Sequence, residues 1–350
     1  MNHIEENKIQ SKSFYYQDKV KQLKDLLGTS DVILTNEGIE INKEFYPIIN
    51  DVIIMLNPSQ YPASIRSEMK VKGIRKETKE FAPDIQDHYS QFWKEWPSLY
   101  TRYEEEFEGY FDLVDLESLS GARVCDLGCG MGRWSYMLAQ RSAVSEVILV
   151  DFSEAIFAAR KLFADDPRAI FFMADLLNLP FKEGSLDFAM SLGVLHHLPE
   201  DCLKVVRMLK PLTPRLLVYL YYALDNKPFY YRLLLKMYTP IRKLTYRIKS
   251  EPIRVAFSWV VFIFCYLPFI ALGYLLRPIG LSKYVPLFDE HHWAGIEGMR
   301  HSAYDRFFTQ IEQRVSRKQI DTLADTFEKV TISKRQAYWH FLCESSTSVE

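Results

Sequence analysis

Short apolar runs alternate with helical patterns through the middle of the chain. The apolar runs have strand length and lie at 124–126, 146–151, 170–175, 186–192 and 215–220. Helical patterns stand between them, as at 134–140 and 205–211. Strands that alternate with helices predict a parallel sheet with helices on both faces, an α/β fold. Such sheets bind ligands outside the carboxyl ends of their strands.

The strand and helix patterns resume near the end of the chain. The sequence Ser-x-x-Gln at 316–319 is a capping-box pattern that predicts a helix over 319–327. Two strand-like runs follow at 330–333 and 337–343. We therefore predict that 85–224 and 300–350 form one core, interrupted by an insertion at 225–299.

Residues 1–84 have a different pattern, with short apolar runs and turn signals between 31 and 56, which predicts a small β-containing module. Segment 85–111 then carries aromatic residues three and four positions apart, on one helical face broken at Pro97. They are Tyr89, Phe92, Trp93, Trp96, Tyr100, Tyr103, Phe107 and Tyr110. Core packing and a lid over a ligand are both compatible with this stripe.

The first strand runs into a loop with glycine at 128, 130 and 132. Glycine lacks a Cβ, so the backbone can turn tightly and a ligand can approach it. A dinucleotide-binding loop needs Gly-x-Gly-x-x-Gly to seat a pyrophosphate, but Arg133 occupies the place of that third glycine. Asp126 would repel a phosphate and suits a cationic ligand, such as a methionine-derived sulfonium with an ammonium group.

In these segments and their order, the chain resembles the class I S-adenosylmethionine-dependent methyltransferases. The resemblance includes the glycine loop, the acid-ended strands at 146–151 and 170–175, the stretch at 186–197, and the helix, Lys-Pro turn and strand at 205–220. It implies a Rossmann-like seven-stranded methyltransferase sheet with helices on both faces and S-adenosyl-L-methionine as cofactor. The cofactor-binding residues that it implies are Asp126, Gly128, Gly130, Gly132, Asp151, Phe152, Asp175, Leu176 and Leu192.

The resemblance also implies where an acceptor would lie. His196 and His197 follow the fourth strand, beside the transferable methyl, and histidine with its ordinary pKa of about 6.5 can accept a proton. They could equally shape the loop. His301 is the third candidate base, in a segment that lines the acceptor pocket of related enzymes. Candidate acceptor contacts are Tyr89, Trp93, His292 and Tyr304.

Metal binding is not expected. Residues 289–305 are rich in His, Asp and Glu but show no known ligand spacing. The five cysteines include no Cys-x-x-Cys pair, which predicts free thiols in a reducing compartment. Residues 1–84 weakly resemble the zinc-ribbon-like domain that accompanies some methyltransferases, but they lack its cysteines.

The composition fits an enzyme of the cytoplasm. The 350 residues are 48% hydrophobic and 25% charged, as in globular proteins, and the N-terminus carries no secretory signal pattern. The net charge of −2 gives no strong nucleic-acid signal. An RNA substrate is kept as an alternative because of the zinc-ribbon-like segment and the basic stretch at 70–79.

The insertion contains 22 uncharged residues at 255–276, between Arg254 and Arg277. As a helix they would extend about 33 Å, enough to cross a bilayer. A single crossing would separate strands of one sheet, so we do not expect a span, and Pro268 is expected to bend the helix. The segment could lie on a membrane through 228–285, cap the active site, or pack on the core or on a second subunit as a homodimer.

For the membrane interpretation, the sequence offers basic residues to meet anionic headgroups. They are Arg232, Lys236, Arg242, Lys243, Arg247, Lys249 and Arg254. The sequence thus favours a membrane-peripheral enzyme that methylates an apolar or lipid-linked small molecule on oxygen or carbon, such as a quinone-like ring. It is also compatible with a soluble metabolite as acceptor, and with a non-catalytic scaffold that binds the cofactor without turnover.

Overall fold

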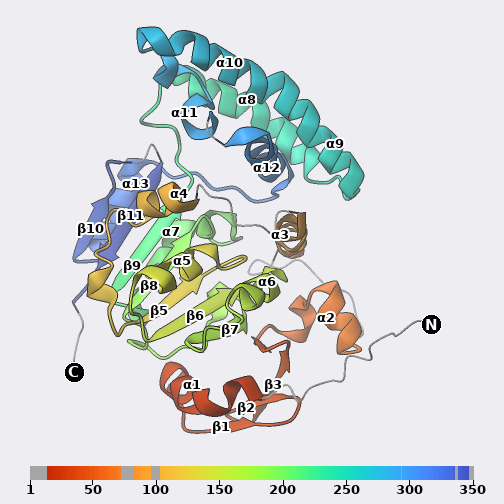
Figure 1. Cartoon of the computed structure of the whole chain (residues 1–350), viewed down its shortest axis with the longest axis vertical. Helices are drawn as coiled ribbons and strands as arrows, with labels where there is room; N and C mark the ends of the chain where they lie inside the picture. Colours follow the sequence, from red (N-terminus) through yellow and green to blue (C-terminus); the bar gives the residue numbers. More distant parts are fainter. Residues whose placement is uncertain (1–13, 72–81, 96–102, 293, 336–337, 347–350) are drawn as a thin grey trace. The chain divides into compact units, whose positions relative to one another are not determined.

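The computed structural model describes residues 14–71, 82–95, 103–292, 294–335 and 338–346 (Figure 1). It divides the chain into two compact units. The sheet unit comprises Met1–Leu220 and Lys318–Glu350, and the helical unit comprises Tyr221–Arg317. Trp96, Pro97 and Tyr100 of the aromatic stripe, and 72–79 of the basic stretch, lie outside the described residues.

The expected Rossmann-like α/β sheet is confirmed. Its strands are β5 (Arg123–Leu127), β6 (Glu146–Asp151), β7 (Ala169–Met173), β8 (Phe188–Leu192), β9 (Arg215–Leu220), β10 (Lys329–Ile332) and β11 (Trp339–Glu344). They lie in the order β7-β6-β5-β8-β9-β11-β10. The first five are parallel, whereas β11 runs antiparallel to β9 and β10 antiparallel to β11. The chain therefore does return to this sheet after the insertion.

Four N-terminal strands continue the same sheet beyond β7. They are β1 (Val32–Leu34), β2 (Gly38–Ile41), β3 (Glu44–Ile49) and β4 (Val52–Ile54). Both residues have positive φ in each of the two-residue turns at 42–43 and 50–51, as in the tight hairpin turns that match strand twist. Strand β4 pairs in parallel with β7, through Ile53 and Phe172. The β-containing module is thus joined to the core by backbone hydrogen bonds.

Helices cover the sheet and carry the remaining segments of this unit. They are α1 (Val20–Leu27), α2 (Ala63–Glu68), α3 (Pro83–Glu95), α4 (Tyr103–Tyr110), α5 (Arg133–Arg141), α6 (Ala155–Leu162), α7 (Cys202–Met208) and α13 (Arg317–Asp321). The helix predicted over 319–327 is shorter than expected. Helix α13 gives way to a 3₁₀ turn at Thr322–Asp325, where the Thr322 hydroxyl donates to the Gln319 carbonyl at 2.7 Å and competes with the backbone ladder.

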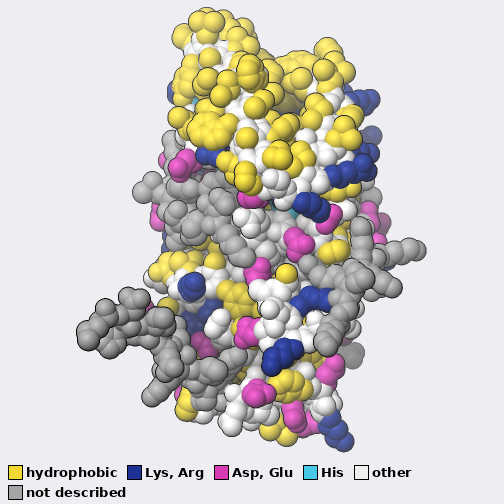
Figure 2. Space-filling model, turned by 90° about the vertical axis from the view of Figure 1, so that its right-hand side faces the viewer, with side chains coloured by type: hydrophobic (Ala, Val, Ile, Leu, Met, Phe, Trp, Pro, Cys, Tyr) yellow, Lys and Arg dark blue, Asp and Glu magenta, His cyan; other side chains and the backbone are white. Residues whose placement is uncertain are grey.

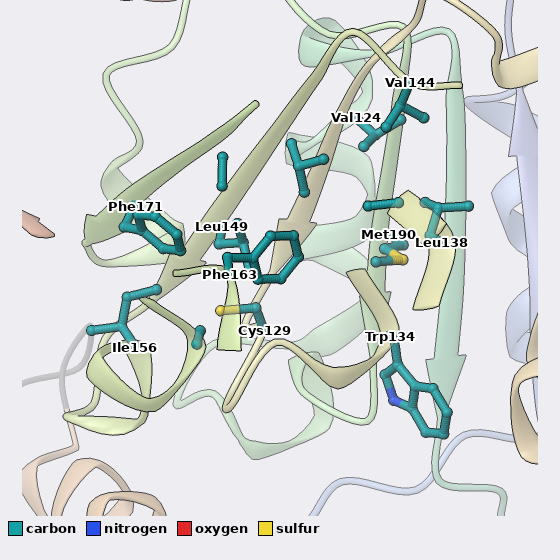
Figure 3. Packing of buried hydrophobic residues seen from close by; sticks show 14 of the residues in the cluster. Val124, Cys129, Trp134, Leu138, Val144, Leu149, Ile156, Phe163, Phe171 and Met190 are labelled. Atoms are coloured by element: carbon teal, nitrogen blue, oxygen red, sulfur yellow. The ribbon is translucent and has the colours of Figure 1, made fainter. Parts of the chain in front are cut away.

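The core of this unit lies between the strands and helices α5 and α6. Leu149, Phe163 and Phe171 are fully buried there, and the rings of Phe163 and Phe171 meet edge to face with centroids 6.2 Å apart (Figure 3). Burial of a large apolar side chain stabilises a fold by about 1.5–3 kcal/mol. The parallel strands carry almost unbroken apolar runs because both of their faces are covered.

The helical unit contains the insertion. Its helices are α8 (Phe229–Thr245), α9 (Glu251–Val261), α10 (Leu267–Leu276), α11 (Phe288–His291) and α12 (Gly295–Phe308). A π-helical turn, η7 (Phe262–Tyr266), joins α9 to α10, so the 22-residue apolar run is helical throughout. Pro268 has no N–H to donate to the carbonyl four residues earlier, and the π-helical turn lies at that point.

Helices α9 and α10 pack on α12 and α11 through polar as well as apolar contacts. Tyr266 and Ser302 share a hydrogen bond of 3.0 Å, and Ser302 also bonds His291 Nε2 at 2.7 Å. Gly273 lies against Phe288, where a Cβ would come within 1.9 Å of the ring. The inward side of the apolar run is therefore fixed to its own unit.

Two of the basic residues expected to face headgroups are buried instead. Arg242 lies 3.7 Å from Glu312 and donates to the Thr309 carbonyl, whereas Arg254 donates to the Ile248 carbonyl at 2.6 Å. Helical periodicity places them on the inward side of α8 and α9, which their charge alone did not reveal. Of the described residues, one helical stretch, Glu251–Ile279, is long and apolar enough to cross a membrane, with 28% of its most apolar window buried.

Candidate functional site

Three acidic residues stand at the carboxyl ends of three neighbouring strands. Asp126 is on β5, Asp151 ends β6, and Asp175 follows β7. Because these strands are adjacent and parallel, their carboxyl ends lie at one edge of the sheet. All three side chains are buried. The sequence predicted this set, and the fold brings it together.

Asp151 fastens the glycine loop to the neighbouring strand. Its Oδ2 accepts a hydrogen bond from the Gly130 N–H at 2.8 Å. Its Oδ1 accepts from the Ser153 N–H at 2.8 Å and from the Ser153 hydroxyl at 2.6 Å. Burial raises the pKa of Asp151, although these hydrogen bonds oppose the rise. The Phe152 backbone N–H also favours the ionised carboxylate, so Asp151 is surrounded by backbone donors and the Ser153 hydroxyl.

Asp126 is buried next to the glycine loop and accepts a hydrogen bond from a neutral hydroxyl. Its Oδ2 accepts from the Ser135 hydroxyl at 2.5 Å. Burial raises the pKa of Asp126 to about 7, with a smaller rise from Asp151 and a partial offset from the Ser135 bond and the charge of Arg133. A positive charge next to Asp126 would favour its ionised form.

Asp175 is oriented by a residue that the sequence did not single out. Its Oδ1 accepts from the Leu177 N–H at 3.0 Å, and its Oδ2 accepts from Gln60 Nε2 at 3.1 Å. Gln60 belongs to the N-terminal segment, in a turn capped by Asn57. No local pattern marks it, because its partner is 115 residues away. Leu176, the expected neighbour of a bound adenine, is buried directly after Asp175.

The glycine loop has the backbone that its sequence predicts. Gly128, Gly130 and Gly132 all have positive φ, between 55° and 85°. A Cβ at Gly128 would come within 2.4 Å of Val194 in the loop after β8, and one at Gly130 within 2.8 Å of the Trp93 indole nitrogen. Glycine is thus required for both turn and close packing.

Helix α3 lies over the carboxyl ends of β5 and β6. Gln86 donates to the carbonyl of Phe152, and the Ser90 hydroxyl accepts from the Glu154 N–H at 3.1 Å. Trp93 packs on Gly130, and the Arg133 guanidinium stands 5.1 Å from the Trp93 ring. These contacts place Trp93 and Phe152 at the strand-end side of the sheet, beside the glycine loop.

The candidate bases of the sheet unit lie in the loop after β8. His196 and His197 are buried in a 3₁₀ turn, with ring centroids 4.1 Å apart. The His197 ring is 5.5 Å from that of Tyr89 on α3. Leu192 ends β8 just before this loop. The structure therefore groups Tyr89, His196 and His197 on the strand-end side where Asp126 also lies.

A cluster of aromatic side chains adjoins this loop. Tyr219 on β9 lies 5.3 Å from Tyr110, 4.7 Å from Tyr338 and 6.2 Å from His196, between ring centroids. Tyr110 in turn lies 5.1 Å from Trp134. The sequence analysis did not single out Tyr219, Tyr338 or Trp134 as neighbours of this loop. A tyrosine near the carboxyl end of a buried strand was the available signal for Tyr219.

The other predicted acceptor residues belong to the helical unit. Tyr304 is fully buried, and its hydroxyl donates to Glu251 at 2.8 Å, which favours a packing role. The His292 ring stacks on Phe288 with centroids 4.6 Å apart. His301 is half-buried on α12. The structure thus does not gather these three around one point.

The two cysteines beside the glycine loop do not favour thiol chemistry. Burial raises the pKa of both Cys125 and Cys129 well above the usual range, so their thiols stay protonated and unreactive. Among the residues that the structure describes, no three His, Cys, Asp or Glu side chains are grouped to hold a metal ion.

Comparison with known families identifies the kind of domain to which the glycine loop and the three acids belong. The family model described as "Methyltransferase domain" matches residues 124–212. This range holds all of β5 but its first residue, β6 to β8, the glycine loop and all three acids. The chain contains a class I S-adenosylmethionine-dependent methyltransferase domain. The expected cofactor of the methyltransferase domain is therefore S-adenosylmethionine.

Curated relatives match the same part of the chain. Trans-aconitate 2-methyltransferase of Variovorax paradoxus is 30% identical over 120 residues, which are 34% of this chain and 46% of that protein. An uncharacterized chloroplastic methyltransferase of Arabidopsis thaliana is 27% identical over 118 residues, 32% of this chain and 33% of that protein. The chain spans less than half the length of these relatives, so what they act on does not transfer to it.

Solved structures give more distant likenesses. An S-adenosylmethionine-dependent methyltransferase from Mesorhizobium loti is 25% identical, with a TM-score of 0.31, and the match covers 35% of this chain and 56% of that one. The pyocyanin biosynthetic protein PhzM is 11% identical, with a TM-score of 0.40 and coverage of 69% and 54%. TM-scores this low carry no argument about substrate.

The residues of the methyltransferase domain suit its cofactor chemically. Asp126 and Asp151 are buried carboxylates with raised pKa, and a sulfonium and an ammonium group would offset that burial. An acid that ends its strand, as Asp151 does, suits a ribose hydroxyl. The apolar side chain of Leu176 beside Asp175 suits an adenine ring. The site thus fits S-adenosylmethionine better than a phosphate-bearing nucleotide.

Proposed function

We propose that this protein transfers a methyl group from S-adenosylmethionine to an apolar or lipid-linked small molecule at a membrane surface. The acceptor atom is oxygen or carbon, and a quinone-like ring is the type of acceptor we favour. The observation that carries methyl transfer is the pair of buried carboxylates, Asp126 and Asp151, on either side of the glycine loop. It is the arrangement expected where a cationic nucleoside binds.

S-adenosylmethionine supplies an electrophilic methyl on its sulfonium. The protein therefore has to position the acceptor, exclude water and, where needed, remove a proton. Asp151 orders the loop through Gly130, and Ser135 fixes the orientation of the Asp126 carboxylate. Gln60 and Leu177 hold Asp175 in place. Alignment of bound reactants can remove about 7–11 kcal/mol of a reaction barrier.

Proton removal is needed only if the acceptor is a hydroxyl or an acidic carbon. His197 is the candidate base that we favour, because it lies in the loop after β8 and its ring is near those of both His196 and Tyr89. A positioned base contributes about 10²- to 10⁴-fold to rate. The aromatic cluster around Tyr219 supports a flat, apolar acceptor next to this loop, since aromatic faces stack on planar rings.

The helical unit supports the membrane part of the proposal. Its exposed side chains on α8, α9 and α10 are largely apolar, which is unusual for a surface that faces only water. An enzyme whose acceptor is dissolved in a bilayer has to reach that bilayer. The proposal therefore assigns the insertion to acceptor access, peripheral to the membrane and on its cytoplasmic side.

The test is to incubate the purified protein with methyl-labelled S-adenosylmethionine and a whole-cell extract, and then separate lipids, small metabolites, proteins and RNA. Label in the lipid fraction is the expected result. Label in water-soluble metabolites or RNA would reject the apolar acceptor, but would still support methyltransferase activity. Absence of label, with the cofactor still bound, would replace catalysis by a scaffold role.

A further inference from the structure

The exposed hydrophobic side chains of this protein are concentrated on one unit. Of the 23 large hydrophobic residues exposed in the described part of the chain, 18 belong to the helical unit. Figure 2 shows them gathered over that unit, with Lys and Arg side chains along one edge. Soluble monomers rarely expose contiguous apolar patches of this kind unless the patch binds something.

Helix α8 shows how this surface is built. Its exposed apolar residues follow one another by three or four positions, which places them on one stripe of the helix. They are Phe229, Leu233, Met237, Ile241 and Leu244. The exposed residues Arg232, Lys236 and Lys243 form a second stripe, about 100° around the helix from the first. The buried residues Tyr231, Arg242 and Thr245 face the unit's interior.

Charge is segregated in the same way. Segment 228–287 contains nine Lys and Arg residues and one acidic residue, Glu251, although the whole chain has a net charge of −2. Glu251 is engaged inside the unit, where it accepts the hydroxyl of Tyr304. Apart from the buried Arg242 and Arg254, the basic residues of this segment are exposed. Within the described segment 228–287, the exposed charges are therefore all positive.

The apolar run of α9, η7 and α10 has one side that cannot face lipid. Arg254 makes its hydrogen bonds inside the unit, Tyr266 bonds Ser302, and the Tyr274 hydroxyl donates to the His292 carbonyl at 3.0 Å. Moving this helix into the bilayer core would break those contacts and expose unpaired polar groups to hydrocarbon. In addition, β9 and β11, which flank the insertion, pair along six residues and so have to lie on one side of a membrane.

We propose that the helical unit docks flat on an anionic lipid bilayer, with α8 and the outer faces of α9 and α10 in the headgroup and acyl boundary. This inference deepens the proposed function by naming its partner surface and orientation. Arg232, Lys236 and Lys243 contact lipid phosphates, while the apolar stripe of α8 enters the boundary beside them. Amphipathic helices with one basic and one apolar side bind membrane interfaces in this way.

A second copy of this chain fits the surface less well. A two-fold dimer would place the same face against itself, and the basic border of one copy would then meet that of the other. Anionic lipid headgroups instead neutralise this border. The exposed apolar residues and the basic excess of 228–287 thus favour a bilayer as occupant.

The binding test is flotation of the full chain with vesicles of phosphatidylcholine, alone or mixed equally with phosphatidylglycerol. Binding to the mixed vesicles only is expected. Each basic residue near an anionic surface changes affinity about five-fold, so R232Q/K236Q/K243Q together should weaken binding on the order of a hundred-fold. The matched control K21Q/K161Q/K318Q changes three exposed lysines of the sheet unit and should bind normally. Equal loss in both variants, or no binding at all, would overturn the proposal.

The orientation needs its own measurement. In a Cys265→Ser background, Lys249→Cys and Lys283→Cys place thiols before and after the apolar run, while the other native cysteines are buried. A membrane-impermeant maleimide added outside the vesicles should label both positions. Protection of one position only would indicate a crossing and contradict flat docking. A lipid-free dimer that L233Q/M237Q disrupts would assign the surface to a second copy instead. None of these readouts needs cofactor or turnover, so they stand apart from the test of methyl transfer.

Discussion

The carboxylate of Asp151 accepts a hydrogen bond from the backbone N–H of Gly130 at 2.8 Å, and so ties the glycine loop to the end of the next strand. This contact links two features that are separate in the sequence. The loop keeps its positive-φ turn next to a buried acid, and the N–H and hydroxyl of Ser153 hold the other oxygen of that acid. Both properties have measurable consequences.

Replacing Asp151 by Asn should weaken S-adenosylmethionine binding. A hydrogen bond to a charged group contributes about 1.5–3 kcal/mol, which corresponds to a loss of about 10- to 100-fold in affinity. Isothermal titration calorimetry measures it. Asp165→Asn, an exposed neighbour of the same residue type, should leave the affinity unchanged. Equal affinity in both variants would remove Asp151 from the cofactor site.

Replacing Gly130 by Ala should destabilise the sheet unit and displace Trp93. The new Cβ would meet the Trp93 indole at 2.8 Å at a φ of 55°, and a left-handed backbone costs an L-residue about 1–2 kcal/mol. Gly184→Ala is the matched control, because its φ is 65° and no atom lies within 4 Å of its Cβ. The excess loss of unfolding free energy at Gly130 reports the contact with α3. If both variants lose the same amount, α3 does not rest on the loop.

Asp126 should make the stability of the free protein depend on pH. Its pKa is about 7 in the fold and about 3.9 in the unfolded chain. Between these values the native state binds more protons, so the unfolding free energy falls as pH rises from about 4 to about 7 and then levels off. Asp126→Asn should flatten this slope, although Asp151 acts in the same direction. Urea unfolding across this range checks it, with Asp165→Asn as the variant that keeps the slope.

The raised pKa of Asp126 also predicts how pH affects cofactor binding. S-adenosylmethionine needs the ionised form of Asp126, so its affinity should fall as pH drops below about 7. S-adenosylhomocysteine lacks the sulfonium and should show a weaker pH dependence. Titration of both ligands at several pH values compares them. Identical pH profiles would mean that Asp126 does not sense the sulfonium charge.

Many site features were predictable because they depend on local pattern. Strands β6 and β9 have the predicted bounds, since an apolar run of strand length ends in a charge or a turn. The glycine loop was recognisable because only glycine adopts its backbone easily. The acids at 126, 151 and 175 followed from the rule that strand ends of a parallel sheet meet.

Other features depend on distant partners and left no local trace. The bond between Gln60 and Asp175 joins residues 115 positions apart, and the pairing of β4 with β7 joins the N-terminal strands to the core. Arg242 and Arg254 were expected at headgroups because charge usually marks exposure. Helical periodicity puts both on the inward sides of α8 and α9, where Glu312 and the Ile248 carbonyl, partners that no local pattern marks, compensate their charge.

Ser302 should matter for the stability of the helical unit. Its hydroxyl bonds both Tyr266 and His291, so Ser302→Ala leaves two buried polar groups without that partner. An unsatisfied buried group costs about 1–3 kcal/mol. Ser250→Ala, at an exposed position before α9 whose side chain makes no capping bond, should change little. Thermal unfolding of the two variants compares them, and matching midpoints would mean that this bond does not fix the apolar run.

The most direct test of the central claim is calorimetric titration of the purified protein with S-adenosylmethionine and, separately, with NAD. The account predicts that S-adenosylmethionine binds at one site per chain, that Asp151→Asn weakens it while Asp165→Asn does not, and that NAD shows no binding. Binding of NAD, or no binding of S-adenosylmethionine by the folded protein, would contradict the account.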